Sequence, residues 1–124
     1  MSISEKGTRG EGVGIADVEA AVERWRVQGY AACPPEQLRD GLRRVRHLVD
    51  IPELQFAGMV TQLAACDEEE WEGHTSPTNW VREECRTSGH AAWNALVVGE
   101  QSARLPESTQ ALLGDQISYP QLSL

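Results

Sequence analysis

One apolar repeat constrains the fold of this chain more than any other feature. Apolar side chains recur along residues 38–66 at alternating steps of four and three residues: Leu38, Leu42, Val45, Val49, Pro52, Phe56, Met59, Leu63 and Cys66. This spacing puts all of them on one edge of an α-helix, as in the heptads of a coiled coil. Pro52 lacks a backbone donor, so we expect a kink or a short break there, and the continuing register favours the kink. The repeat, called the seam below, predicts a long, kinked helix with one apolar edge.

The remaining sequence predicts shorter helices and no strands. Residues 1–14 are polar and glycine-rich and are expected to form a disordered tail. Helical spacing begins at Ile15 and returns in residues 78–86, 90–105 and 107–113. The candidate N-caps of the second and third of these helices are Ser76 or Thr78, and Thr87 or Ser88. We therefore predict an all-α fold, an elongated helical bundle in which the long helix packs against shorter ones. The helical module spans residues 15–124, and an apolar pattern that stops at Leu124 predicts a module that is incomplete at its C-terminus.

The net charge and the cysteines limit the classes of protein that fit. The formal net charge is −8. Because DNA-binding proteins need basic surface to neutralise phosphates, this acidity lowers the expectation of autonomous DNA binding. Three cysteines without a CxxC pair indicate reduced thiols in a cytoplasmic protein. No apolar run is long enough to cross a membrane, so we expect no membrane partner.

Basic side chains are concentrated near the start of the long helix. Four arginines lie within residues 39–46: Arg39, Arg43, Arg44 and Arg46. Arginines that flank an apolar seam are usually solvated or paired with carboxylates, and this is the interpretation that we favour. The alternative is a strip of side chains that faces the phosphates of DNA.

Residues 78–105 have the layout of a helix-turn-helix motif, with the turn at residues 87–89. The second helix would then be a recognition helix, which needs side chains that reach base edges. Apart from a histidine at its start, its only basic side chain is Arg104, at the wrong end for this role. We therefore favour two packed helices over a DNA-reading motif. The candidate DNA contacts of this segment are His90 and Asn94, and the core anchors of the favoured packing are Trp80 and Trp93.

The sequence offers little for a metal site or for catalysis. Zinc ligand types occur at Cys66, His74, Cys85 and His90, but their gaps do not match the close ligand pairs of structural zinc sites. We expect no metal or cofactor, and we interpret Cys66 and Cys85 as small buried hydrophobic residues. His90 and Asn94 are the residue types that open an HNH nuclease motif, yet no histidine follows them to hold the metal. Motifs for nucleophilic catalysis and for phosphate loops are also absent from the sequence, so we predict that the chain is not an enzyme.

Residues 71–122, WEGHTSPTNWVREECRTSGHAAWNALVVGEQSARLPESTQALLGDQISYPQL, resemble a module of known proteins. The order of their motifs is similar to that in the N-terminal module of actinobacterial HNH endonuclease-like proteins, the thirteen-E-twelve repeat family, where the module is a domain of unknown function. The resemblance covers roughly residues 36–124. The matching positions are Trp71, Gly73, Ser76, Trp80, Ala91, Ala95, Leu105, Pro106, Gly114, Ile117 and Ser118.

The resemblance implies a helical accessory module that is associated with HNH nucleases. The chain stops before the family's HNH domain, so no catalytic residue of the family has a counterpart here. We expect a non-catalytic module that acts in protein association, with a second copy or a related protein bound through the seam. The alternative is a DNA-binding module of a nuclease-related protein. The expected structural anchors are Trp71, Gly73, Trp80, Trp93 and Pro106.

Overall fold

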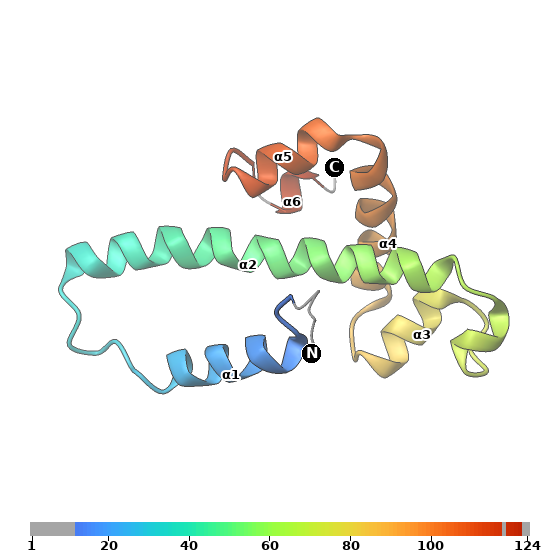
Figure 1. Ribbon diagram of the computed structural model, residues 1–124, viewed down its shortest axis with the longest axis horizontal. Helices are drawn as coiled ribbons and strands as arrows, with labels where there is room; N and C mark the ends of the chain where they lie inside the picture. Colours follow the sequence, from blue (N-terminus) through green and yellow to red (C-terminus); the bar gives the residue numbers. More distant parts are fainter. Residues whose placement is uncertain (1–11, 118, 123–124) are drawn as a thin grey trace, which may run out of the picture. The chain divides into compact units, whose positions relative to one another are not determined.

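The structure, a computed structural model, describes residues 12–117 and 119–122, and in these residues it contains helices and their connections without a strand (Figure 1). The helices are α1 (Ile15–Arg26), α2 (Pro35–Ala64), the 3₁₀ helix η1 (Glu68–Trp71), α3 (Pro77–Glu84), α4 (Gly89–Arg104), α5 (Pro106–Leu113) and α6 (Tyr119–Leu122). The prediction of an all-α fold is confirmed. Residues 1–11 of the expected tail lie outside the described residues.

The chain divides into two compact units, Met1–Leu38 and Arg39–Leu124. In the first unit, α1 begins where the Gly14 N–H donates to Asp17 Oδ2 at 3.1 Å. Asp17 thus lies at the helix end that favours negative charge, and two arginines lie in the last turn, where positive charge is favoured. No residue of α1 is buried, so the helix adds no side chain to a hydrophobic core.

Helix α2 runs without interruption through Pro52, so the alternative of a break at this residue is wrong (Figure 1). Proline in a helix interior leaves the carbonyl four residues earlier, here that of Leu48, without its helical donor. Both Pro52 and Leu48 are exposed, so water can bond this carbonyl in place of the missing N–H. The exposed position explains how the helix continues.

One cluster of buried residues forms the hydrophobic core, and it lies in the second unit. Most of its side chains are small, which allows the helix backbones to approach one another closely. Every α-helix that follows α1 contributes to it. Its members are Ala57 and Val60 of α2, Val81 of α3, Ala92, Ala95 and Val98 of α4, Leu112 of α5 and Tyr119 of α6.

The face of α2 that enters this core is not the seam. The buried residues of α2 are Asp50, Ala57 and Val60. At 100° of rotation per residue, the centre of this buried face lies about 100° around the helix from the centre of the seam. Only Phe56 and Leu63 of the seam pack partly against the core. From Leu38 to Leu63 the seam is a helical edge, as predicted, although Cys66 lies beyond the end of α2; it is not the edge on which the domain closes.

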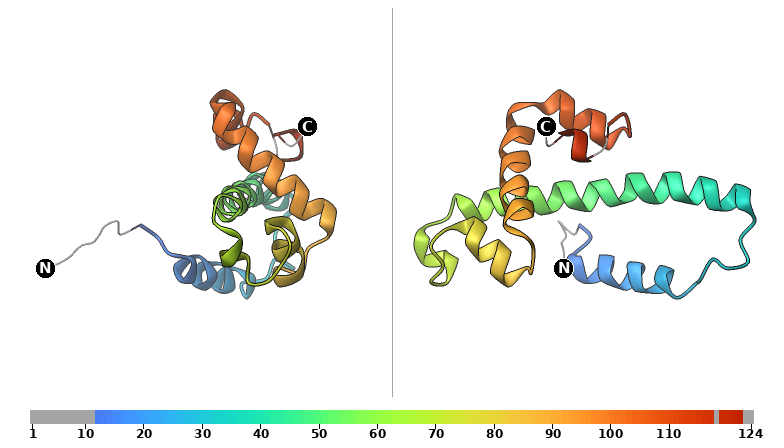
Figure 2. Two further views of the ribbon diagram at one scale, coloured as in Figure 1. Left: turned by 90° about the vertical axis from the view of Figure 1, so that its right-hand side faces the viewer. Right: turned by 180° about the vertical axis from the view of Figure 1, so that it is seen from behind.

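Helix α4 crosses α2 instead of running beside it, as all three views show (Figures 1 and 2). Gly99 marks the crossing point and is buried. A Cβ atom added at Gly99 would collide with Thr61 Oγ1 and with the backbone oxygen of Ala57, and would lie 3.0 Å from the Ala57 carbonyl carbon. The crossing is therefore so close that only glycine fits at position 99.

Serine side chains set the starts of α3 and α4. The Asn79 N–H donates to Ser76 Oγ at 3.0 Å, and the Ala91 N–H donates to Ser88 Oγ, also at 3.0 Å. Each bond satisfies a backbone donor that the first helical turn leaves free. Of the predicted alternatives, Ser76 and Ser88 are the caps. Pro106 separates α4 from α5 and is the first residue of α5, a position that suits proline.

Candidate functional site

Three of the expected anchors hold the connection between α2 and α3 in place. Trp71 is partly buried, and its Nε1–H donates to the Leu63 carbonyl oxygen at 3.1 Å, which fastens η1 to the end of α2. Trp80 packs against the core and donates its Nε1–H to Glu72 Oε1 at 2.7 Å. Gly73 has a φ of +88°, a backbone conformation that strongly favours glycine. These contacts hold η1 and the turn that follows it against α2 and α3.

The expected burial of Trp93 and of two cysteines is wrong. Trp93 keeps 59% of its surface exposed and lies outside the core, because it is one residue beyond the buried Ala92 and points away from it. Ala92, Ala95 and Gly99 form the buried face of α4, and this close-packed face has no room for an indole. Cys66 and Cys85 are also exposed, since each lies just after the end of a helix instead of on a buried face.

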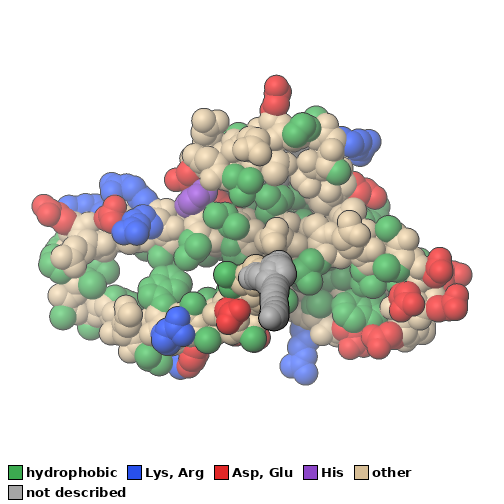
Figure 3. Space-filling view, in the orientation of Figure 1, with side chains coloured by type: hydrophobic (Ala, Val, Ile, Leu, Met, Phe, Trp, Pro, Cys, Tyr) green, Lys and Arg blue, Asp and Glu red, His purple; other side chains and the backbone are tan. Residues whose placement is uncertain are grey.

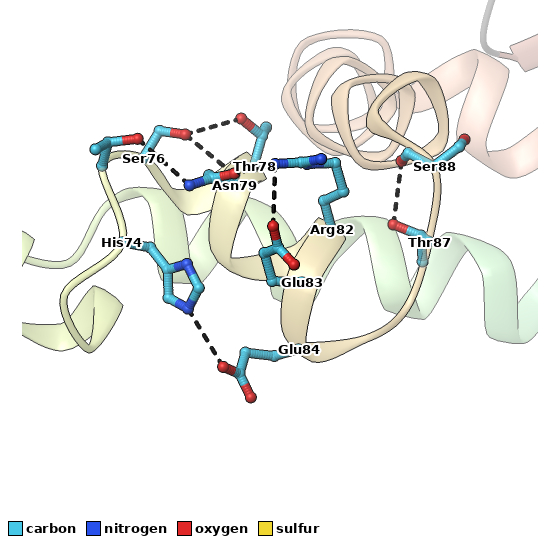
Figure 4. A network of polar contacts seen from close by, with 10 residues as sticks. His74, Ser76, Thr78, Asn79, Arg82, Glu83, Glu84, Thr87 and Ser88 are labelled. Atoms are coloured by element: carbon cyan, nitrogen blue, oxygen red, sulfur yellow. Dashed lines mark hydrogen bonds and ion pairs between the residues drawn. The ribbon is translucent and has the colours of Figure 1, made fainter.

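The structure contains the predicted helix, turn and helix, formed by α3, residues 85–88 and α4. Figure 4 shows the polar side chains that surround this turn. His74 Nε2 lies 3.2 Å from Glu84 Oε2, which links the segment before α3 to its last turn. Arg82 donates to Asn79 Oδ1 at 2.8 Å and lies 3.1 Å from Glu83 Oε1. Arg82, the single arginine of α3, is therefore engaged by side chains of its own helix.

The two candidate DNA contacts on α4 lie near its start. His90 is exposed, whereas Asn94 is partly buried. An open pocket of about 260 Å³ lies between α3 and the start of α4 and is lined by Thr75, Ser76, Thr78, Asn79, Arg82 and Gly89. Its hydroxyl and amide groups are engaged mainly in capping and in bonds to one another. The surface around α4 therefore presents little free cationic charge to DNA.

The four arginines of α2 fall into two classes. Arg44 lies 3.6 Å from Asp40, and Arg46 lies 3.1 Å from Asp50, so each has a carboxylate partner one turn away. Arg39 and Arg43 are exposed and form no ion pair with any described residue. Figure 3 shows basic side chains gathered over the N-terminal part of α2 and acidic ones over the other end, where η1 follows.

A polar cluster at the middle of α2 was not predicted. Asp50 is 1% exposed, and the Arg46 guanidinium reaches its Oδ1 at ion-pair distance but without hydrogen-bond geometry. Burial raises the pKa of the Glu53 carboxyl, an effect that Arg46 opposes and Asp50 strengthens. Burial and the Glu53 carboxylate raise the pKa of the Tyr119 hydroxyl. The only hint in the sequence was an acidic residue on the flank of an apolar repeat.

The same cluster ties α2 to the turn between α5 and α6. His47 Nδ1 lies 3.2 Å from Asp115 Oδ1 without hydrogen-bond geometry, and Asp115 has a φ of +63°. The turn thus places the Asp115 carboxylate against α2, and Asp115 adopts a backbone conformation that few non-glycine residues adopt. The arrangement explains how the short α6 is positioned, since Tyr119 is the buried residue that follows.

One surface of α2 stays apolar and uncovered. We call it the outer stripe, and it consists of Leu42, Val45, Leu48, Val49, Pro52 and Met59. Leu42 is 69% exposed and Met59 is 59% exposed. Of the six side chains, only Val45 is partly buried. Five of its six members belong to the seam, Leu48 lies next to them, and none belongs to the buried residues of α2.

Known ligand sites and known relatives give no direct indication of function. Within residues 12–117 and 119–122, no group of three or more His, Cys, Asp or Glu residues could hold a metal ion. In the same residues no helix has both the length and the apolar character needed to cross a membrane. No protein-family model, no curated protein and no solved structure matches the chain.

Proposed function

We propose that this chain is a non-catalytic helical module that acts in protein association, and that the outer stripe of α2 is its contact surface. The observation that carries the proposal is the exposure of adjacent large apolar side chains on a helix that a different face anchors in the core. Contiguous apolar surface of this kind is uncommon on a monomer and marks interaction sites. The resemblance to the N-terminal module of HNH endonuclease-like proteins supports an accessory role of this kind.

The geometry of the stripe suits a partner helix. Its residues follow the steps of three and four that bring side chains to one edge of a helix, and such an edge binds the apolar face of another helix. The stripe lies on a helix anchored to the core by Ala57 and Val60, so it is a preformed surface. A preformed surface lowers the ordering entropy that binding must overcome.

A synthetic helical peptide tests this proposal. The peptide has leucine at every seam position over about three heptads, and glutamine at the flanking positions so that it carries no charge beside the seam. We expect the labelled peptide to bind the full chain in fluorescence anisotropy. We expect Leu42→Ser combined with Val49→Ser to weaken binding by at least about tenfold, because two apolar contacts are lost.

The matched control replaces two exposed leucines elsewhere, Leu105→Ser with Leu113→Ser. This variant has a similar loss of exposed apolar surface but leaves the outer stripe intact, so it should bind the peptide like the unaltered chain. Sedimentation velocity over a range of chain concentrations measures self-association in the same samples. Absence of peptide binding, together with a chain that stays monomeric, would refute the proposal.

The second candidate function is DNA binding, which rests on the unpaired Arg39 and Arg43 and on the short turn between α3 and α4. It predicts that the affinity for labelled duplex DNA falls steeply as salt rises. Arg39→Ala with Arg43→Ala would then reduce both the affinity and its salt dependence. Protein association predicts no salt-sensitive binding of DNA by a chain that circular dichroism shows to be helical. The scarcity of basic side chains on α4 places this candidate second.

A further inference from the structure

A row of arginines follows one margin of the outer stripe, and its nearest member, Arg46, lies about 40° around α2 from Leu42. Arg39, Arg43 and Arg46 fall within about 60° of one another around α2, at 100° per residue, and we call this row the arginine edge. Two of its members have no ion-pair partner among the described residues, and the third is ion-paired with the buried Asp50 while half of its own side chain stays exposed. The exposed part of α2 is therefore apolar on one side and basic on the adjacent side.

This basic character is local and runs against the charge of the whole chain. Residues 36–49 contain four arginines and two carboxylates, whereas the chain as a whole has a net charge of −8. Exposed arginines that form no ion pair are well hydrated, so they add little to the stability of the chain itself. Placed beside an apolar contact surface, they select for partners of opposite charge.

We propose that the outer stripe and the arginine edge together bind a helical segment of another protein that is apolar on one face and acidic along the adjacent edge. This inference rests on the proposed function, since it identifies the partner of the same surface. The apolar face of the partner covers Leu42, Val45 and Val49. Its carboxylates lie against Arg39 and Arg43, which are exposed and free to pair.

A second outer stripe does not fit this surface. If two outer stripes pair in antiparallel fashion over residues 38–49, Arg39 of one copy lies against Arg46 of the other, and like charges oppose each other. If they pair in parallel, Arg46 lies against Gly41, which has no side chain to accept a hydrogen bond. Neither arrangement supplies carboxylates to the arginine edge, whereas an acidic partner helix does.

Two further peptides test the inference. Both keep the leucine seam of the neutral peptide, and the flanking positions are all glutamate in one and all lysine in the other. We expect the full chain to bind the glutamate peptide on the order of tenfold more tightly than the lysine peptide at about 0.1 M salt. The difference should shrink at about 1 M salt, because the screening length falls from about 10 Å to about 3 Å.

A charge-reversal variant identifies the residues responsible. Arg39→Glu with Arg43→Glu should invert the preference, so that the lysine peptide binds more tightly. Arg46 is left unchanged because it is ion-paired with the buried Asp50. The matched control, Arg86→Glu with Arg104→Glu, makes the same change of charge at two exposed positions away from α2 and should leave the preference unchanged. Circular dichroism of both variants confirms that they remain helical.

The outcomes separate this inference from the proposed function. If all three peptides bind equally well, the stripe is a contact surface without charge selection, and only the acidic partner is overturned. If no peptide binds but the chain self-associates through Leu42 and Val49, the occupant is a second copy, and the inference is again overturned. If no peptide binds and the chain stays monomeric, both the inference and the proposed function fail.

Discussion

The close crossing of α4 over α2 at Gly99 predicts how one added methyl group changes the stability of this protein. We expect Gly99→Ala to destabilise the second unit, although alanine is the better helix former by about 1 kcal/mol. The new Cβ would collide with Thr61 Oγ1 and with the backbone oxygen of Ala57. The Thr61 side chain can turn away, but a backbone oxygen moves only if α2 and α4 separate.

The magnitude follows from these two opposing terms. Overpacking a core costs typically 1–3 kcal/mol, and about 3 kcal/mol is the appropriate value where backbone must move. Subtracting the helix-propensity gain of about 1 kcal/mol leaves a net loss of about 2 kcal/mol. For a domain of this size that loss lowers Tm by roughly 8–16 °C. Thermal unfolding followed by far-ultraviolet circular dichroism measures this shift.

Two other glycines provide matched controls. Gly41 and Gly58 both lie in α2, and a Cβ added at either would meet no atom within 4 Å. Alanine at these positions should therefore raise the stability by about 0.5–1 kcal/mol, so the same substitution has the opposite sign. Adding Thr61→Ala to Gly99→Ala should recover part of the loss, because it removes one of the two collisions. A Gly99→Ala protein as stable as the Gly58→Ala protein would refute the close crossing of α4 over α2.

Three further predictions follow from burial and charge. Trp80→Ala should cost about 2–3 kcal/mol of stability, whereas Trp93→Ala should change it by no more than about 0.5 kcal/mol, as measured by urea unfolding. Glu53→Gln should raise Tm at pH 7 and have little effect at about pH 4. The raised pKa of Glu53 means that its charged form disfavours the folded state. This penalty grows as pH rises from the pKa of the unfolded state through the pKa of the folded state. An equal effect of the substitution on Tm at both pH values would contradict the burial of this carboxyl. Cys66 and Cys85 should react with a thiol reagent in the native protein as readily as in urea, since both are exposed.

Helix α2 illustrates which structural features apolar periodicity alone can predict. The seam correctly predicted a continuous helical edge, and the capping serines correctly marked where α3 and α4 begin. Periodicity says which side chains share an edge but not what covers that edge. The outer stripe therefore became recognisable as an uncovered surface only when the buried face of α2 was known.

The errors at Trp93 and the cysteines have a common cause. Tryptophan and cysteine are usually buried, so their expected burial followed from residue type. In α4 the closeness of the crossing at Gly99 decided otherwise, because the buried face has to consist of small residues. Residue type cannot reveal this, since the spacing of two helix axes depends on atoms from both helices.

The sequence by itself determined the local structure of this protein: its all-α class, the helix starts and ends, and the glycine-dependent turn at Gly73. These features depend on interactions between neighbours in the chain, which a sequence displays directly. Only the tertiary structure decided which face of α2 is buried, which arginines lack a partner, that Asp50 is buried beside Arg46, and that His47 lies against Asp115. These depend on contacts between segments far apart in the chain, and those contacts are set by how whole helices pack.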